Sequence, residues 1–138
     1  MPIHRLNPYL QLNGNAAKAI ELYERALGAK VTTISRFGDV PNTPPEDKDR
    51  IMHCALQIGG GELMLTDASG PSGASAAAGP VQIALHLDDD EDAPRMFEAL
   101  AAGGKIGQPL VDTFWGAKFG SLVDAFGIHW MFNCEKKK

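Results

Sequence analysis

Three histidines carry the side chains in this sequence that are best suited to acid–base or metal chemistry. His53, His86 and His129 each lie in a short segment with the alternating pattern of a β-strand. Because an imidazole titrates near neutral pH, His53 is the best candidate for a catalytic acid or base. The sequence favours the alternative for His53, which is a structural hydrogen bond. A metal site that joins the three histidines to Glu62 is a further alternative. The histidines lie on three different strands and at different heights, which argues against this site.

A second group of candidates is aromatic. Trp115 and Phe119 stand in a segment punctuated by Gly116 and Gly120, where backbone or a ligand can approach closely. Their rings either form the apolar or stacking wall of a pocket or pack at a hinge or dimer seam, and the sequence leaves these alternatives even. Phe37, in a long loop, is placed to close such a pocket.

The sequence lacks the signals of several other classes of protein. It contains no GxSxG, GxGxxG or P-loop, so serine hydrolases, Rossmann enzymes and NTPases gain no support. Cys54 and Cys134 lie in separate apolar runs, which predicts buried, reduced thiols. A net charge of −4 without a basic stripe argues against nucleic acid. Without a run of ~20 apolar residues or a signal-peptide core, we expect no membrane contact and a cytoplasmic location.

The elements that position these candidates follow an order that occurs twice in the 138 residues, a length that fits one domain. Residues 7–12 alternate as a short strand, and Asn13, Gly14 and Asn15 supply turn and cap residues. A helix follows, and Gly28 ends it. The apolar stripe of this helix consists of Ala16, Ala19, Ile20, Tyr23 and Leu27.

The same order recurs in the second half of the chain. Residues 82–87 form an alternating strand, residues 88–90 bring negative charge to a helix start, and this helix ends at Gly103. Each module is a strand, a helix and three strands, which is an α+β fold. Module 1 covers about 4–66, a linker about 67–80 and module 2 about 81–135. The remaining strands are predicted near 30–36, 51–58, 60–65, 105–111, 118–123 and 127–132.

Side-chain alternation divides each predicted sheet into two faces. One face is apolar and should pack beneath the helices. The other mixes amides, thioethers, a tyrosine and imidazoles, which suits a half-lined concavity that binds a ligand. Dimer contact against the mixed face is the alternative. The mixed face includes Asn7, Tyr9, His53, Met64, Gln82, His86, His129 and Met131.

Two segments interrupt the strand order. Residues 36–50 form a proline-containing loop, and residues 66–80 form a Gly/Ala/Ser-rich connection. Either segment is a plain surface loop or a flap over a site; for the second, a plain linker is favoured, and for the first the alternatives stay open. Asp39 and Asp67 lie at or near these loops, where turn or cap roles are favoured over contact with a cationic ligand. Asp124 is interpreted as structural.

Several segments together are similar to a known family. The chain resembles the vicinal oxygen chelate superfamily of glyoxalase and bleomycin resistance proteins, and within it the PhnB-like branch. This resemblance implies two βαβββ modules that form an incomplete barrel around a cleft, and it implies a homodimer. The segments that carry it are Pro8-Tyr9-Leu10, Asn13-Gly14-Asn15, Arg36-Phe37-Gly38-Asp39, Ile51-Met52-His53, Thr113-Phe114-Trp115-Gly116, Phe119-Gly120 and Asp124-Ala125-Phe126-Gly127.

The resemblance also implies where a metal would bind. Metal-dependent members use one His, Gln or Glu ligand from each of four strands, and the matching positions here are Asn7, Met64, Gln82 and Met131. Two thioethers are unsuited to the hard cations that such sites hold, and Gln82 alone remains plausible. We therefore expect no metal and no cofactor.

Three hypotheses follow for the function. The first is a metal-free protein that binds a small molecule as a homodimer. The second is a metal-dependent lyase, transferase or dioxygenase with rearranged ligands, and the third is a scaffold whose concave face contacts another protein. Whether the chain is an enzyme stays open. The expected ligand-binding residues of the first hypothesis are Asn7, Tyr9, Phe37, His53, Met64, Gln82, Trp115, Phe119 and Met131.

Overall fold

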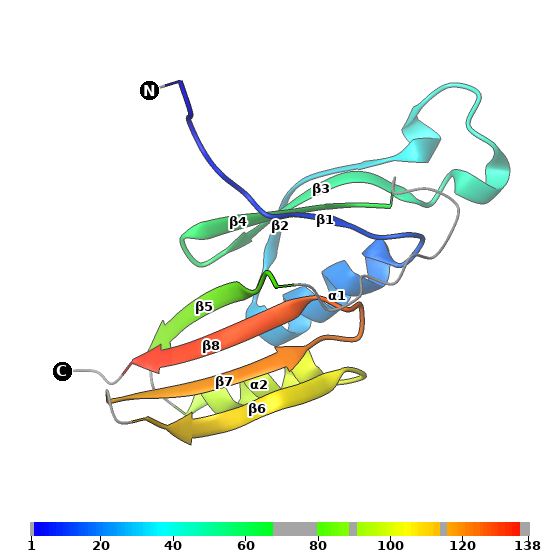
Figure 1. Cartoon of the computed structure of the whole chain (residues 1–138). Helices are drawn as coiled ribbons and strands as arrows, with labels where there is room; N and C mark the ends of the chain where they lie inside the picture. The colour runs from blue at the N-terminus through cyan, green and yellow to red at the C-terminus, as the bar shows by residue number, and fades with distance from the viewer. Residues whose placement is uncertain (1, 68–79, 89–90, 114–115, 136–138) are drawn as a thin grey trace. The chain divides into compact units, whose positions relative to one another are not determined.

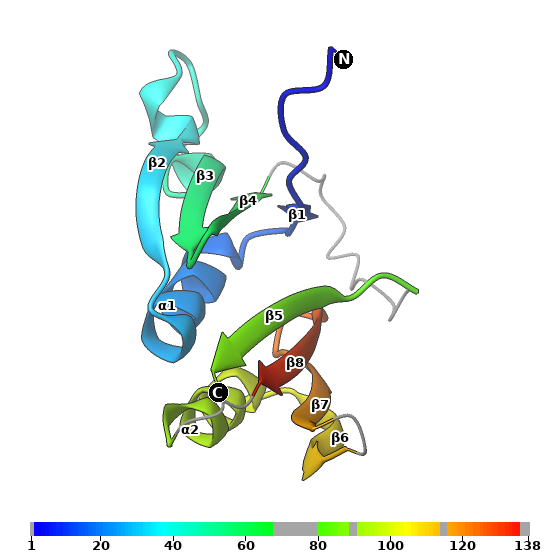
Figure 2. The ribbon, with the colours of Figure 1, turned by 90° about the vertical axis from the view of Figure 1, so that its left-hand side faces the viewer.

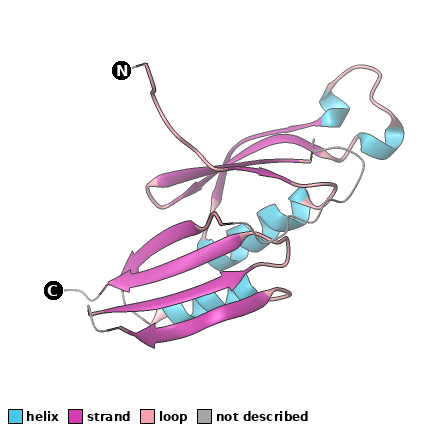
Figure 3. Cartoon of the chain, viewed as in Figure 1, coloured by secondary structure: helices cyan, strands magenta, loops and turns pink. Residues whose placement is uncertain are grey.

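The structure consists of two similar units. The computed structural model describes residues 2–67, 80–88, 91–113 and 116–135. The chain divides into two compact units, Met1–Ala74 and Ser75–Lys138. Each contains one four-stranded sheet and one α-helix (Figure 1; Figure 3), which confirms the predicted α+β fold of two βαβββ modules. The linker expected at about 67–80 falls almost wholly outside the described residues.

The first unit follows the predicted order of elements. They are β1 (Tyr9–Gln11), α1 (Ala16–Leu27), β2 (Lys30–Arg36), β3 (Ile51–Ile58) and β4 (Gly61–Thr66). The strand order in the sheet is β1-β4-β3-β2. β1 runs parallel to β4, whereas the other neighbouring strands are antiparallel. The first strand of the unit therefore pairs with its last strand, and β1 and β2 form the two edges of the sheet.

The second unit repeats this topology. Its elements are β5 (Ile83–Asp88), α2 (Asp92–Ala101), β6 (Lys105–Asp112), β7 (Ala117–Val123) and β8 (His129–Glu135). The strand order is β5-β8-β7-β6, with β5 parallel to β8. In the part of the chain that the structure describes, neither helix is long and apolar enough to cross a membrane.

Helix α1 has the boundaries that its sequence predicts. The residues of the predicted stripe are buried, and they face the sheet at intervals of three and four. Gly28 takes a left-handed φ of 68° and its N–H donates to the carbonyl of Glu24, which ends the helix. Asn15 occupies the N-cap position, as expected, but its side chain makes no capping hydrogen bond.

Helix α2 starts later than the acidic run suggested. Asp88 is the last residue of β5, and the helix begins at Asp92 after Glu91 in the capping position. Residues 89–90 lie outside the described residues. β5 pairs with β8 as far as Asp88 and Glu135. Asp88, which was expected at the start of the helix, therefore belongs to the strand.

The apolar sheet faces pack against the helices, as predicted (Figure 2). In the second unit, Phe97 of α2 meets Phe132 of β8 edge to face, with 5.1 Å between the ring centroids. Gly120 lies beside them, since a Cβ there would approach Phe97 to 2.9 Å. This glycine therefore makes room for the helix. Fully buried side chains of the two cores include Tyr23, Leu56, Leu65, Leu100, Leu122, Trp130 and Phe132.

Candidate functional site

A tyrosine and a histidine meet on the face of the first sheet that is turned away from α1, which we call the open face. The register pairs Tyr9 of β1 with Met64 of β4, and Met64 with Ala55 of β3. His53 lies two residues before Ala55 and therefore points to the same side. The Tyr9 hydroxyl reaches across β4 to Nδ1 of His53 at 3.1 Å.

The two rings also contact each other. Their centroids are 5.7 Å apart with an interplanar angle of 63°, which is an edge-to-face arrangement. Tyr9 is 46% exposed, and His53 and Met64 are half-buried. Solvent or a ligand can therefore reach a phenol, an imidazole and a thioether on neighbouring strands.

The hydrogen bond with Tyr9 orients the imidazole of His53. Nδ1 is engaged, so the opposite edge of the ring carries Nε2, which makes no hydrogen bond to the described residues. If Nε2 carries the proton, it is a donor and the Tyr9 hydroxyl donates to Nδ1. If Nδ1 carries the proton, Nε2 is an acceptor and the Tyr9 hydroxyl is free to donate outward. Both tautomers thus present one donor and one acceptor to a ligand.

Asn7 lies just before β1 at the edge of the open face. Its Nδ2 donates to the carbonyl of Glu62 on β4 at 2.9 Å. The Glu62 carboxylate is 3.6 Å from the guanidinium of Arg5. These contacts fasten the approach to β1 onto β4, so the amide of Asn7 has a structural role.

The corresponding face of the second sheet is less polar at its centre. Met131 of β8 pairs with Ala84 of β5 and with Ser121 of β7. Phe119 pairs with Asn133, whose Nδ2 lies 3.4 Å from Nδ1 of His86. Met131 and Phe119 are half-buried.

Two further candidates lie at the start of the strands of this face. Gln82 is exposed and precedes β5. His129 opens β8, and its Nε2 is buried without a hydrogen-bond partner among the described residues. A half-buried imidazole with an unused nitrogen thus accompanies Met131 on the same side of β8.

The registers allow the two faces to be matched residue by residue. Leu65 pairs with Leu10 and Cys54, and Phe132 pairs with Leu85 and Gly120. The residues one position earlier on each strand are then also equivalent, which matches Met64 with Met131. By the same step Tyr9 corresponds to Ala84, and His53 corresponds to Phe119. The tyrosine–histidine pair therefore belongs to the first unit, and its place in the second holds a methyl group and a phenyl ring.

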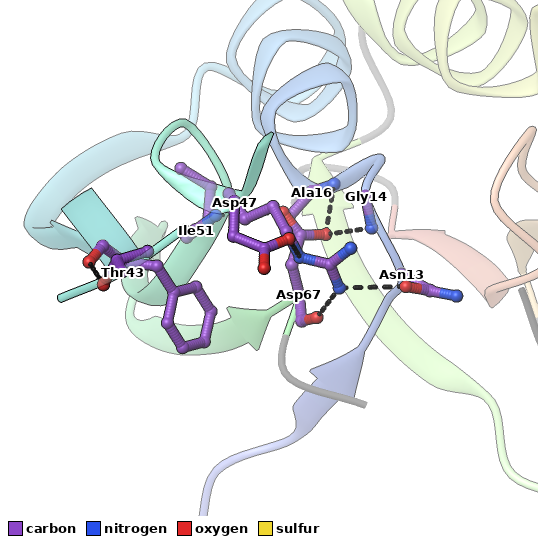
Figure 4. A network of polar contacts seen from close by, with 9 residues as sticks. Asn13, Gly14, Ala16, Thr43, Asp47, Ile51 and Asp67 are labelled. Atoms are coloured by element: carbon purple, nitrogen blue, oxygen red, sulfur yellow. Dashed lines mark hydrogen bonds and ion pairs between the residues drawn. The ribbon is translucent and has the colours of Figure 1, made fainter. Parts of the chain in front are cut away.

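Asp67 forms a buried centre that sequence patterns did not reveal in full (Figure 4). Its Oδ1 accepts hydrogen bonds from the backbone of Gly14 at 2.8 Å and Ala16 at 3.0 Å, and its Oδ2 accepts one from Ile51 at 3.0 Å. The side chain is 1% exposed. The predicted cap role is confirmed, but the helix capped is α1, 51 residues earlier.

Arg50 extends this centre. Its Nη2 donates to Oδ1 of Asn13 at 2.9 Å and to the carbonyl of Asp67, and its Nε lies 4.0 Å from Asp47. One guanidinium thus ties the start of α1, the end of the 36–50 loop and the residue that follows β4. Asn13 lies in the bend between β1 and α1, as expected, and its side-chain oxygen makes a tertiary contact with Arg50.

The 36–50 loop is held by its own backbone. Phe37 N–H donates to the carbonyl of Arg50, and Gly38 N–H donates to the carbonyl of Lys48. The Thr43 hydroxyl donates to the carbonyl of Phe37 at 2.6 Å. Phe37 is half-buried where β2 ends, and Asp39 accepts from the N–H of Arg36 at 3.0 Å, a turn role as expected.

Asp124 is structural, as its turn sequence suggested. Its Oδ1 accepts from the N–H groups of Phe126 and Ile128, and its Oδ2 accepts from the indole Nε1 of Trp130 at 2.8 Å. A buried carboxylate therefore closes the turn between β7 and β8. Trp115, expected in a pocket wall, lies outside the described residues.

Comparison with known proteins identifies the family. The model of the glyoxalase/bleomycin resistance protein/dioxygenase superfamily matches residues 5–132. The chain belongs to this superfamily. It is 34% identical to Protein YjdN of Escherichia coli K12, over 96% of this chain and 97% of that protein. It is 32% identical to the uncharacterized protein Rv0887c of Mycobacterium tuberculosis, over 91% of this chain and 71% of that protein.

Similar solved structures confirm the fold. Protein PA1353 from Pseudomonas aeruginosa is 38% identical and superposes with a TM-score of 0.82, over 98% of this chain and 100% of that one. A structure described as a putative 3-demethylubiquinone-9 3-methyltransferase, PhnB protein, from Bacillus cereus is 22% identical with a TM-score of 0.79, over 95% and 99% of the two chains. The predicted resemblance to the superfamily is thus confirmed, with a PhnB protein among the structural neighbours.

The side chains at the superfamily's metal-ligand positions do not fit a metal centre. Met64 and Met131 offer only thioethers, and the amide of Asn7 is committed to the carbonyl of Glu62. Among the described residues, no three His, Cys, Asp or Glu side chains gather in an arrangement that could hold a metal ion.

Proposed function

We propose that this chain is a metal-free protein that binds a small molecule with an aromatic or apolar body and at least one hydrogen-bonding group. The hydrogen-bonded pair of Tyr9 and His53 beside Met64 carries this proposal. A phenol, an imidazole and a thioether on one sheet face combine polar recognition with apolar contact, as ligand sites do.

The burial of this face supports binding over a purely structural role. The helix-facing side chains of the same strands, such as Cys54 and Leu65, are fully buried, whereas Tyr9 is 46% exposed. A large aromatic side chain that stays exposed while its hydroxyl is already paired has surface left for a partner.

The corresponding face of the second unit has a different polarity. Met131 and Phe119 give it a thioether and a phenyl ring, and Gln82 gives it an amide. We propose that Met131, Phe119, Trp115 and Phe37 offer apolar contacts to a ligand. His53, Gln82 and the amide oxygen of Asn7 offer polar ones. We further propose that the protein acts as a homodimer in the cytoplasm.

A thermal-shift screen with aromatic and apolar compounds tests the proposal. A ligand at about 100 times its Kd stabilises the folded protein by about 2.7 kcal/mol, which raises the Tm of a chain of this size by about 8 °C. The increase should be lost in Met64→Ala combined with His53→Gln. It should be retained in His86→Gln, because His86 is an exposed histidine of the second unit that pairs with Asn133.

A protein interface is the alternative that the exposed Tyr9 favours. In that case no compound of the screen raises the Tm, whereas dilution below the dimer's Kd lowers it. That pair of results would replace the small-molecule proposal.

A further inference from the structure

A single hydrogen bond couples Tyr9 and His53. When the pair gains or loses a proton, the donor and acceptor roles of its two outward-facing groups therefore change together. In the neutral pair, one outward group donates and the other accepts. When His53 gains a proton, Nδ1–H must donate to the Tyr9 oxygen. The Tyr9 O–H and the Nε2–H of His53 then both donate outward. The protonated pair therefore offers two donors and a positive charge to one ligand oxygen.

We propose that this pair binds a phenol-class ligand as its phenolate, and the inference rests on the small-molecule binding proposed above. The ligand arrives as a neutral phenol and its O–H donates to Nε2 of His53. The O–H bond breaks, the proton forms a bond to Nε2, and the electron pair stays on the ligand oxygen. The resulting phenolate accepts hydrogen bonds from Nε2–H of His53 and from the Tyr9 hydroxyl.

The chemistry of the surrounding face selects a phenol. The Tyr9 ring and the Met64 thioether offer contacts that suit an aromatic body. A simple phenol has a pKa of about 10, so a phenol acidified by an electron-withdrawing substituent gives up its proton more readily near neutral pH. A carboxylic acid is already ionised at neutral pH and has no proton to give.

The charged groups near His53 are compatible with the binding of such an anion. The charges that act on the neighbouring Cys54 thiol are those of Glu24 on α1 and Arg36 on β2. On β4, Glu62 is paired with Arg5 at 3.6 Å, and β1 contributes Tyr9 itself. None of the ion pairs among the described residues includes His53. A bound phenolate would therefore be the counter-charge of the imidazolium.

The test uses 4-nitrophenol, whose phenolate absorbs visible light and whose neutral form does not. At a pH at which the free phenol is mostly neutral, adding wild-type protein should raise the phenolate absorbance. The apparent pKa of the bound phenol should fall by about one unit, which is a tenfold shift in its ionisation. Histidine-selective ¹⁵N NMR should show the imidazolium pattern at His53 when the ligand is bound.

Variants locate the effect. His53→Gln and His53→Phe should abolish the absorbance increase; the second introduces the residue found at the equivalent position in the other unit, Phe119. Tyr9→Phe should reduce it, because one donor to the phenolate is lost. His86→Gln is the matched control and should behave as wild type. Thermal unfolding of each unliganded variant checks that it is folded.

The methyl ether 4-nitroanisole distinguishes phenolate binding from the more general proposal that the protein binds a small molecule. Tighter binding of the phenol than of the ether, with increased phenolate absorbance, supports the inference. Equal binding of both without an absorbance increase overturns it and leaves the small-molecule proposal standing. Binding of neither probe overturns it as well, and the broader compound screen then decides the small-molecule proposal alone. Because these comparisons use wild-type protein, they hold even if a His53 variant does not fold.

Discussion

The hydroxyl of Tyr9 lies 3.1 Å from Nδ1 of His53, although 44 positions separate the two residues in sequence. The contact depends on the strand order, in which β4 lies between β1 and β3. Tyr9 therefore reaches diagonally over the strand that carries Met64. The two residues, which lie on different strands, form one hydrogen-bonded pair on an otherwise mixed surface. The equivalent positions of the second unit hold no such pair.

Asp67→Asn should destabilise the first unit strongly. The Asp67 carboxylate accepts three backbone N–H groups, and an amide would turn a donor toward at least one of them. We expect a loss of about 2–4 kcal/mol in the free energy of unfolding, measured by urea denaturation. Asp39→Asn is the matched control, because Asp39 accepts an exposed hydrogen bond, and it should change stability by less than about 0.5 kcal/mol. Equal effects of the two substitutions would contradict the central role of Asp67.

The thiol of Cys54 should be inert to thiol reagents at pH 8. Burial, and secondarily the negative charge of Glu24, raises the pKa of Cys54 from 9.0 to about 11, while Arg36 acts in the opposite direction. A thiolate is the reactive form, and it is scarce three units below this pKa. Folded protein should therefore react with Ellman's reagent at Cys54 only at the rate of unfolding. Rapid labelling without unfolding would contradict the burial of this side chain.

The same group makes stability depend on alkaline pH. Because the folded pKa of Cys54 is higher than the unfolded one, the unfolded state loses its proton first as pH rises. Stability is therefore complete below pH 9 and falls by about 2–3 kcal/mol up to pH 11. Cys54→Ala should be less stable than wild type at pH 7 but should lose less stability over this interval. Parallel pH profiles of the two proteins would argue against the effect.

Gly120→Ala should weaken the second unit. The added methyl group would lie 2.9 Å from Cε1 of Phe97, which is itself packed against Phe132. Overpacking of this kind costs about 1–3 kcal/mol. Gly60→Ala is the control, since a Cβ there meets nothing within 4 Å. Heat-induced unfolding of both variants measures the difference, and an unaffected Gly120→Ala protein would mean that α2 can shift freely.

Protein purified without chelator should retain no stoichiometric metal, even after exposure to Mn²⁺, Fe²⁺, Ni²⁺ or Zn²⁺. The reason is the pair of thioethers at Met64 and Met131 and the committed amide of Asn7. Elemental mass spectrometry measures the content. Nearly one equivalent of metal, lost on His53→Ala or Gln82→Ala, would restore the hypothesis of a metal-dependent lyase, transferase or dioxygenase.

Local patterns predicted the elements well where one residue determines a boundary. Gly28 ends α1 through its left-handed backbone, and the alternation of β3 gave residues 51–58 without error. The first strand is shorter than predicted, since β1 begins at Tyr9. Pro8 has no N–H to donate, although its carbonyl accepts from the N–H of Met64.

Contacts over long distances in sequence were beyond these patterns. Alternation placed Tyr9 and His53 on one face, but their meeting depends on the position of β4 between their strands. In the same way, the cap of α1 comes from Asp67 and not from the neighbouring Asn15. A carboxylate that caps a helix 51 residues away leaves no periodic signal, because its partners are backbone N–H groups.

Because the registers of the two sheets match, the open face of the second unit serves as an internal reference for the open face of the first. Each position of the first open face has an equivalent in the second with the same backbone setting. Met64 and Met131 keep the same side chain, whereas His53 and Phe119 differ in chemistry. Ala84→Tyr combined with Phe119→His would copy the pair into the second unit. Such a chain would turn an internal duplication into a molecule with two equivalent recognition sites, and the stoichiometry of bound ligand per chain would then double.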